Sequence, residues 1–227
     1  MTENGKQKTT RNSSAGRGMR VIVIAVAIFL AIAGVLYAIV QPANKQNAAN
    51  SACAASTTVA QAIRPLATGD VASLNVPRQP KPATPLAFDG PGGKRLTLAD
   101  FAGKTILVNL WATWCAPCRA EMPALDRLQA RLGGASFEVV AISIDTARLE
   151  RRQMFLGSVG VKSLAFYSDD KANIFQVLKQ AGKVVGLPTT ILIDGRGCEI
   201  GVMAGPAEWD SPAAVKLLET AISSGKT

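Results

Sequence analysis

Histidine is absent from this 227-residue chain, and cysteine occurs only four times, as a C-x-x-C pair (Cys115 and Cys118) and as two single residues (Cys53 and Cys198). A zinc site would therefore have to use all four cysteines, although the single ones lie far from the pair in sequence. We expect no metal site, and a four-cysteine zinc site is the weaker alternative. Redox chemistry at the C-x-x-C pair is the favoured interpretation.

The charge pattern does not indicate a nucleic-acid-binding protein. The formal net charge is +9, but five of the 25 Lys and Arg residues and one of the 16 Asp and Glu residues precede residue 41, which leaves +5 for the rest of the chain. The densest basic cluster, residues 148–152, includes Glu150 and is typical of a solvated helix face. We expect no nucleic-acid partner, whereas acidic proteins or a membrane surface fit the mild basic excess.

Residues 21–40 form an uninterrupted apolar run of 20 residues, long enough for a helix to span a bilayer. Basic residues dominate before it, so the positive-inside rule places the N-terminus in the cytoplasm. We predict a single-pass inner-membrane protein with a cytoplasmic tail (1–20), a transmembrane anchor (21–40), a linker (41–51) and a periplasmic domain (52–227). A cleavable signal peptide is a weaker alternative, because the run is long and no strong cleavage site follows. A buried core helix is weaker still, because no face of the run is polar.

The C-x-x-C pair lies where a strand passes into a helix. Residues 105–110 are apolar and β-prone, and residues 116–132 have the pattern of an amphipathic helix, which places Cys115 at the helix N-terminus. Unpaired backbone N–H groups and the helix dipole favour a thiolate there and lower the pKa of Cys115. Cys118 follows about one turn later. The pattern predicts thiol–disulfide exchange, in which Cys115 attacks and Cys118 resolves the mixed disulfide.

The rest of the chain after the apolar run predicts alternating helices and strands, with a proline-rich passage of no regular structure at residues 77–85. We expect helices at residues 53–67, 146–159, 173–180 and 212–223, strands at 137–144 and 164–167, and hairpins at 86–98 and 189–203.

The run at residues 109–118, which reads NLWATWCAPC, resembles the thioredoxin superfamily. The order of the expected elements agrees with that resemblance. The helix and strand near residues 146–167 and the N-terminal hairpin resemble the exported TlpA, ResA and CcmG proteins over residues 84–225, and the TlpA type most, through Glu-Met-Pro at 121–123 and a second cysteine pair. The resemblance implies an α/β thioredoxin fold with an N-terminal hairpin and helix extension and a central αβ insertion, preceded by one transmembrane helix.

The resemblance also implies roles for individual residues. Pro188 matches the superfamily's cis-proline, beside which a client segment pairs as an added strand; an ordinary trans proline is the alternative. Glu121 is placed to exchange a proton with the cysteines, unless it is only a solvated glutamate favoured by the helix dipole. Asn109 stands where cytosolic thioredoxins have a buried aspartate. Pro117 stiffens the turn, and Trp114 packs at its rim.

Cys53 and Cys198 match the additional cysteine pair and are expected to form a structural disulfide, with two buried free thiols or an electron relay as alternatives. The central dipeptide, Ala116-Pro117, contains no histidine to favour a strong oxidant, so a reductant is expected. No cofactor beyond the redox-active disulfide is expected.

By resemblance, the clients are Sco-type copper chaperones and the oxidase subunit that carries the dinuclear copper centre, in cytochrome c oxidase assembly. The electron donor is a DsbD- or CcdA-type membrane protein. Reduction of apocytochrome c, or of its chaperones, in cytochrome c maturation is the alternative. Hypotheses of other classes are a copper metallochaperone that uses Cys115 and Cys118 as ligands, and a passive scaffold.

Overall fold

The computed structural model describes residues 24–37 and 52–225. The chain divides into two compact units, Met1–Ala48 and Ala49–Thr227. In the first unit, residues 24–37 form a helix. Among the described residues, no helix is both long enough and apolar enough to cross a membrane. The predicted tail and linker, and both ends of the predicted anchor, lie outside the described residues.

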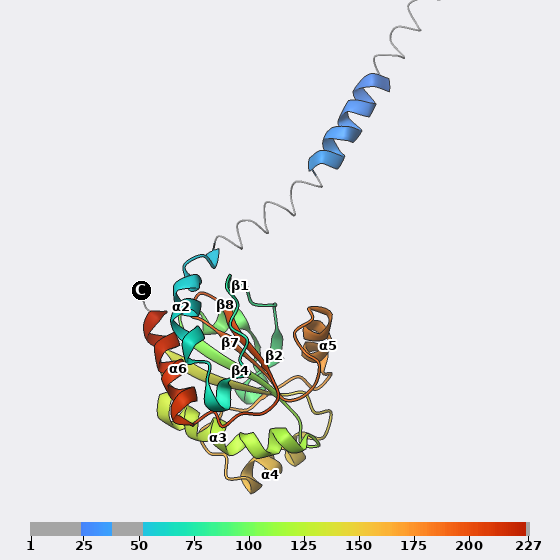
Figure 1. The fold of residues 1–227 in the computed structure, drawn as a ribbon. Helices are drawn as coiled ribbons and strands as arrows, with labels where there is room; N and C mark the ends of the chain where they lie inside the picture. Colours follow the sequence, from blue (N-terminus) through green and yellow to red (C-terminus); the bar gives the residue numbers. More distant parts are fainter. Residues whose placement is uncertain (1–23, 38–51, 226–227) are drawn as a thin grey trace, which may run out of the picture. The chain divides into compact units, whose positions relative to one another are not determined.

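An eight-stranded sheet forms the centre of the second unit (Figure 1). Three neighbouring strands, β4, β5 and β6, run parallel, and every other neighbouring pair is antiparallel. In order across the sheet, the strands are β1 (Lys81–Pro82), β8 (Cys198–Ala204), β7 (Thr189–Ile193), β4 (Thr105–Trp111), β5 (Phe137–Ser143), β6 (Tyr167–Ser168), β2 (Ala87–Asp89) and β3 (Arg95–Thr97).

Strand β4 is buried along its whole length, because both faces of the sheet are covered. Alternate side chains point to opposite faces, so Leu107 and Trp111 belong to one hydrophobic cluster and Val108 to the other. Asn109 shares the face of Leu107 and Trp111. The first face is covered by helices α2 (Ser56–Ile63), α3 (Ala116–Leu132), α4 (Leu149–Ser158) and α6 (Pro212–Ser224). The second face is covered by helix α5 (Asn173–Gln180), and residues of β2 and β3, at the edge of the same sheet, also belong to the second cluster.

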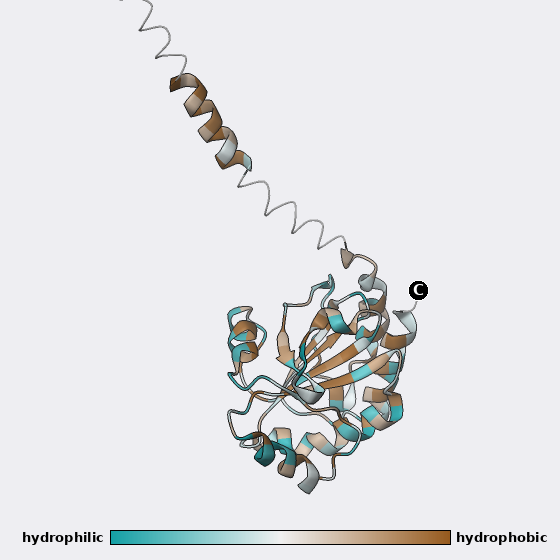
Figure 2. Cartoon of the chain, turned by 180° about the vertical axis from the view of Figure 1, so that it is seen from behind, coloured by the Kyte–Doolittle hydropathy of each residue, from teal (hydrophilic) through white to brown (hydrophobic). Residues whose placement is uncertain are grey.

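In the second unit, apolar residues concentrate on the strands, and the helices carry polar residues on their outer sides (Figure 2). This arrangement of a central sheet between two covering layers is the thioredoxin-like α/β fold that the resemblance implied.

The helices α3 and α5 have the predicted bounds, and β7 begins where the predicted hairpin at 189–203 begins. Among the strands, β1 and β6 differ most from prediction. β1 lies in the proline-rich passage, where Pro82 can occupy an edge strand because an edge position needs no donor toward solvent. β6 starts at Tyr167, later than predicted, because the N–H groups of residues 162–164 donate to the carboxylate of Asp126 instead of a neighbouring strand.

Candidate redox site

Cys115 is the N-cap residue of α3, and its disulfide with Cys118 closes over the first helical turn. Its backbone is extended, and its Sγ accepts a hydrogen bond from the backbone N–H of Cys118 at 3.2 Å. Pro117 lies in the first turn, where a missing N–H costs nothing. A sulfur at this position lies at the positive end of the helix dipole, which favours a thiolate after reduction.

The two sulfurs of this pair differ in accessibility. Cys115 is 6% exposed, whereas Cys118 is fully buried. Trp114, the residue before the pair, is 68% exposed and stands at the rim of the site. An incoming disulfide can therefore reach Cys115 but not Cys118, which is the asymmetry that an attacking and a resolving thiol require.

The peptide bond between Leu187 and Pro188 is cis. Pro188 is buried and leads directly into β7, which pairs with β4. Leu187 and Trp114 line the same hollow, so the cis-proline loop lies beside the turn that carries the cysteines.

Glu121 lies one turn beyond Cys118 on α3 and is buried, with 2% exposure. The alternative of a solvated first-turn glutamate is therefore wrong. Its carboxylate accepts three hydrogen bonds, one on Oε1 from Nδ2 of Asn109 (2.8 Å) and two on Oε2, from the backbone N–H of Ala207 and from Nε1 of Trp209 (3.2 Å each). Burial raises the pKa of Glu121 to about 7, although these three hydrogen bonds lower it in part.

Asn109 connects three elements at this point. Its Nδ2 also donates to Oγ1 of Thr190 at 3.0 Å, the residue that pairs with it on β7, while its Oδ1 is buried without a partner. Asn109 therefore supplies a donor to Glu121, and it cannot take the proton that a buried aspartate could hold.

A hollow of about 270 Å³ extends from Glu121 and is lined by Asp70, Ala120, Pro206, Ala207 and Glu208. The buried carboxylate therefore lies next to open space. Ala207 and Trp209 were not among the predicted site residues. The Gly-Pro-Ala-Glu-Trp sequence at 205–209 is distinctive, but it does not reveal that Ala207 and Trp209 contact Glu121, which is more than 80 residues earlier in the chain.

Cys53 and Cys198 form a second disulfide, and each is 1% exposed. It joins the segment just before α2 to β8. Beside it, Oγ of Ser56 donates to Oδ2 of Asp194 at 2.5 Å, and Asp194 also accepts a hydrogen bond from the backbone N–H of Cys198. The surrounding contacts fix this disulfide within the core.

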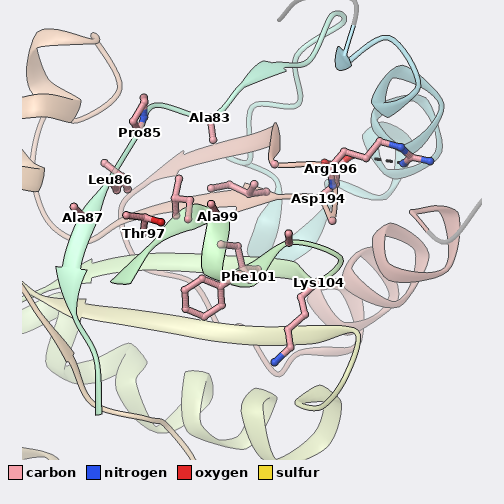
Figure 3. A pocket seen from close by; sticks show the side chains of 16 residues that line it. Ala83, Pro85, Leu86, Ala87, Thr97, Ala99, Phe101, Lys104, Asp194 and Arg196 are labelled. Carbon is pink, nitrogen blue, oxygen red and sulfur yellow. Dashed lines mark hydrogen bonds and ion pairs between the residues drawn. The ribbon is translucent and has the colours of Figure 1, made fainter. Parts of the chain in front are cut away.

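Another hollow, of about 520 Å³, lies at the start of β4, whereas the cysteine turn follows the end of this strand (Figure 3). Its lining is mostly apolar, with Phe101 at its base and Lys104 at its margin. Arg196 and Asp194, which also line it, form an ion pair. No cysteine lines this hollow, so it is separate from the redox site.

The basic cluster at 148–152 is exposed, as the sequence predicted, at every residue except Arg152. Arg152 is 2% exposed, and its Nη1 lies 2.6 Å from Oδ1 of Asp170. Its guanidinium also lies over the ring of Phe166, 5.5 Å from the centroid. The prediction fails for Arg152 because α4 turns this residue, together with Phe155 one turn later, toward the interior.

Residues 79–221 match the family model described as Redoxin. Among curated proteins, the chain is 34% identical over 113 residues to the thiol-disulfide oxidoreductase ResA of Bacillus subtilis (50% of this chain, 60% of ResA). It is also 34% identical over 108 residues to the thioredoxin-like protein YneN of the same organism (46% of this chain, 59% of YneN). The matched region thus spans about three fifths of these relatives.

A solved structure of similar fold is the thiol:disulfide interchange protein, a thioredoxin family protein, of Chlorobium tepidum. It has a TM-score of 0.52 and 26% sequence identity, and the match covers 63% of this chain and 97% of that chain. The comparisons confirm the predicted place in the TlpA, ResA and CcmG branch of the thioredoxin superfamily. Because the Redoxin family model matches more than half of the residues, the chain belongs to the Redoxin family.

Proposed function

We propose that this protein is a thiol–disulfide oxidoreductase that reduces cysteine pairs in other proteins. The observation that carries the proposal is the asymmetric disulfide at the N-terminus of α3, with Cys115 within reach of an incoming protein and Cys118 buried behind it. The names of the curated relatives support the same chemistry.

In the reduced protein, the thiolate of Cys115 attacks one sulfur of a client disulfide. A mixed disulfide forms, and the client's other sulfur leaves as a thiolate. Cys118 then loses its proton and attacks Sγ of Cys115, which releases the client's second thiolate. Two electrons pass to the client, its two sulfurs take up protons, and the Cys115–Cys118 disulfide is formed.

We assign Glu121 the proton exchange that accompanies the second step. It follows Cys118 by one helical turn, and it is buried beside a hollow that reaches toward solvent. Its pKa of about 7 lets it accept or release a proton near neutral pH.

The proposal includes an inner-membrane anchor at residues 21–40, with the second unit in the periplasm. The length of the apolar run and the basic residues before it support this location. The proposed clients are Sco-type copper chaperones and the copper-centre subunit of cytochrome c oxidase, because copper binds only to reduced thiols. A DsbD- or CcdA-type membrane protein would supply electrons. Apocytochrome c reduction is the second candidate.

The first test is the reduction potential of the Cys115–Cys118 pair, with Cys53 and Cys198 monitored separately by mass spectrometry. We expect a value nearer to about −270 mV, as in thioredoxin, than to about −120 mV, as in DsbA. A value at the oxidising end would overturn the proposed direction of electron flow.

Clients are tested with the Cys118→Ser variant, which cannot resolve its mixed disulfide. We expect it to trap oxidised Sco-type protein through Cys115, and the Cys115→Ser variant to trap none. Preferential trapping of apocytochrome c would favour the second candidate. Protease digestion of spheroplasts tests the location, because only a periplasmic unit is digested from outside.

A further inference from the structure

Large apolar side chains are exposed around the redox site. In residues 52–225, the most exposed are Val185 (89%), Trp114 (68%) and Met154 (68%). Trp114 directly precedes Cys115, Val185 lies in the loop that leads to the cis peptide bond at Pro188, and Met154 shares a hollow with Trp114. Exposed apolar residues that converge on one site indicate a surface that contacts another protein.

Two hollows meet at Trp114. The first, which we call the apolar hollow, has a volume of about 380 Å³ and is lined among others by Trp114, Ile144, Phe175 and Leu187. The second, which we call the arginine hollow, has a volume of about 530 Å³ and is lined among others by Thr113, Trp114, Arg119, Arg151, Met154 and Phe155. A client segment at Cys115 would therefore have hollows of different chemistry on its two sides.

The arginine hollow carries positive charge without a partner. Arg119 and Arg151 are both exposed, and in the described part of the chain neither forms an ion pair with a carboxylate. The guanidinium of Arg119 lies over the ring of Phe155, 5.4 Å from the centroid, which holds it at the wall.

The acid in this hollow does not neutralise these charges by contact. Asp145 is 3% exposed, and its carboxylate accepts hydrogen bonds from the backbone N–H groups of Thr113 (2.9 Å) and Ala147 (2.8 Å) and from the hydroxyl of Thr113. Arg152, next to Arg151 in the sequence, is buried against Asp170. Two guanidinium groups thus remain open to an incoming anion.

We propose that the arginine hollow recognises an acidic residue of the client close to its reactive cysteine, while an apolar residue on the other side of that cysteine enters the apolar hollow. This inference rests on the proposed function and specifies the client sequence it acts on. Arginine binds a carboxylate through paired N–H donors, and charges at the rim of an interface mainly accelerate association. The apolar side chain adds burial that a small disulfide compound cannot supply.

The test uses the full chain in detergent and two peptides, each with one internal disulfide. The peptides are identical except for a Glu or a Gln within three positions of the attacked cysteine. We expect kcat/KM to be about fivefold higher for the Glu peptide, equivalent to about 1 kcal/mol. The ratio should fall toward one at about 0.5 M salt, because exposed charges are screened.

The Arg119→Glu/Arg151→Glu variant should abolish or reverse this preference. The readout is the ratio of kcat/KM for the Glu peptide to kcat/KM for the Gln peptide within one variant, because any change in the reactivity of Cys115 affects both peptides equally. Lys216→Glu is the matched control, because Lys216 is an exposed residue of α6 that lines neither hollow. This variant should keep the wild-type ratio.

Reduction of 2-hydroxyethyl disulfide, which is small and uncharged, separates the two proposals. If the wild type reduces this compound but treats the Glu and Gln peptides alike, the arginine hollow does not select acidic clients. If it reduces neither the compound nor the peptides, the proposed oxidoreductase function is itself wrong.

Discussion

Glu121 is a buried carboxylate that accepts three hydrogen bonds. Asn109, Ala207 and Trp209 each donate to it, from β4 and from the segment that precedes α6. Burial opposes its negative charge, and the donors stabilise that charge. The balance leaves a group that titrates near neutral pH, with a pKa of about 7.

This balance predicts a pH-dependent stability. The pKa of Glu121 is about 7 in the folded protein and 4.5 for an ordinary glutamate, so between these values the folded state holds a proton that the unfolded chain has released. The free energy of unfolding therefore falls as pH rises through this window, by up to about 3 kcal/mol, and the loss is complete above it. Urea unfolding at a series of pH values measures the slope.

The Glu121→Gln variant should lack that slope, whatever its absolute stability. Glu219→Gln is the control, because Glu219 is an exposed residue of α6 that lies 3.7 Å from Arg131. An unchanged slope in Glu121→Gln would mean that another group causes the pH dependence.

Removing the donor from Asn109 should move the titration of Glu121 upward. In Asn109→Leu, the carboxylate loses the hydrogen bond from Nδ2 and keeps its burial, so its pKa rises above about 7. The pH profile of thiol–disulfide exchange should shift to higher pH with it. A profile that shifts to lower pH, or does not move, would show that Asn109 does not support the ionised form.

At the scale of elements, the sequence predicts regular segments well and their irregular neighbours poorly. The buried strand β4 and the helix α3 follow from local hydrophobic patterns and from the cysteine turn between them. The position of β6 depends instead on Asp126, which lies on α3 and binds three backbone N–H groups of a loop 36 to 38 residues later. No local pattern encodes such a contact.

The same long-range dependence explains what was missed at the candidate site. The resemblance pointed to Glu121, but two of its hydrogen-bond donors, Ala207 and Trp209, are 86 and 88 residues away in sequence. Sequence spacing can place a side chain on a helix face, but it cannot say what packs against that face.

Asp126 should therefore control the order of the loop between α4 and β6. Asp126→Ala leaves three N–H groups without their acceptor, at a cost of about 3 kcal/mol, whereas Asp126→Asn keeps a carbonyl oxygen and should cost about 1 kcal/mol. Urea unfolding gives both values, and hydrogen exchange at Lys162, Ser163 and Leu164 should accelerate most in the alanine variant. Unchanged exchange at these amides would contradict the role of Asp126.

At the scale of the whole molecule, the Cys53–Cys198 disulfide spans 145 residues of sequence, and the Cys115–Cys118 disulfide spans three. In the chain-entropy model, removal of the disulfide that closes the long loop lowers the free energy of unfolding by up to about 5 kcal/mol, and removal of the disulfide that closes the short loop lowers it by much less. The Cys53→Ala/Cys198→Ala variant should thus unfold at lower urea concentration than Cys115→Ala/Cys118→Ala. An equal decrease in the free energy of unfolding for the two variants would show that the Cys53–Cys198 disulfide does not restrict the unfolded chain.

The second unit should be stable without the first. Both hydrophobic clusters consist of residues after Cys53. A chain of residues 49–227 should therefore have the same melting temperature as this unit in the full chain, and the same rate with 2-hydroxyethyl disulfide. A clearly lower melting temperature would mean that the first unit contributes to the fold.

The long disulfide also determines how the second unit would respond to mechanical load. A force applied to the chain on the N-terminal side of Cys53 acts on the Cys53–Cys198 disulfide first and on α2 only afterwards. Through the disulfide, the force passes to β8, which pairs with β7, and β7 pairs with β4. Tension from an N-terminal tether would thus be borne by a covalent bond to the sheet. The helix α2 and the segment that leads to β1 lie outside that path. The redox site therefore stays intact under tension even if these segments resist unfolding only weakly.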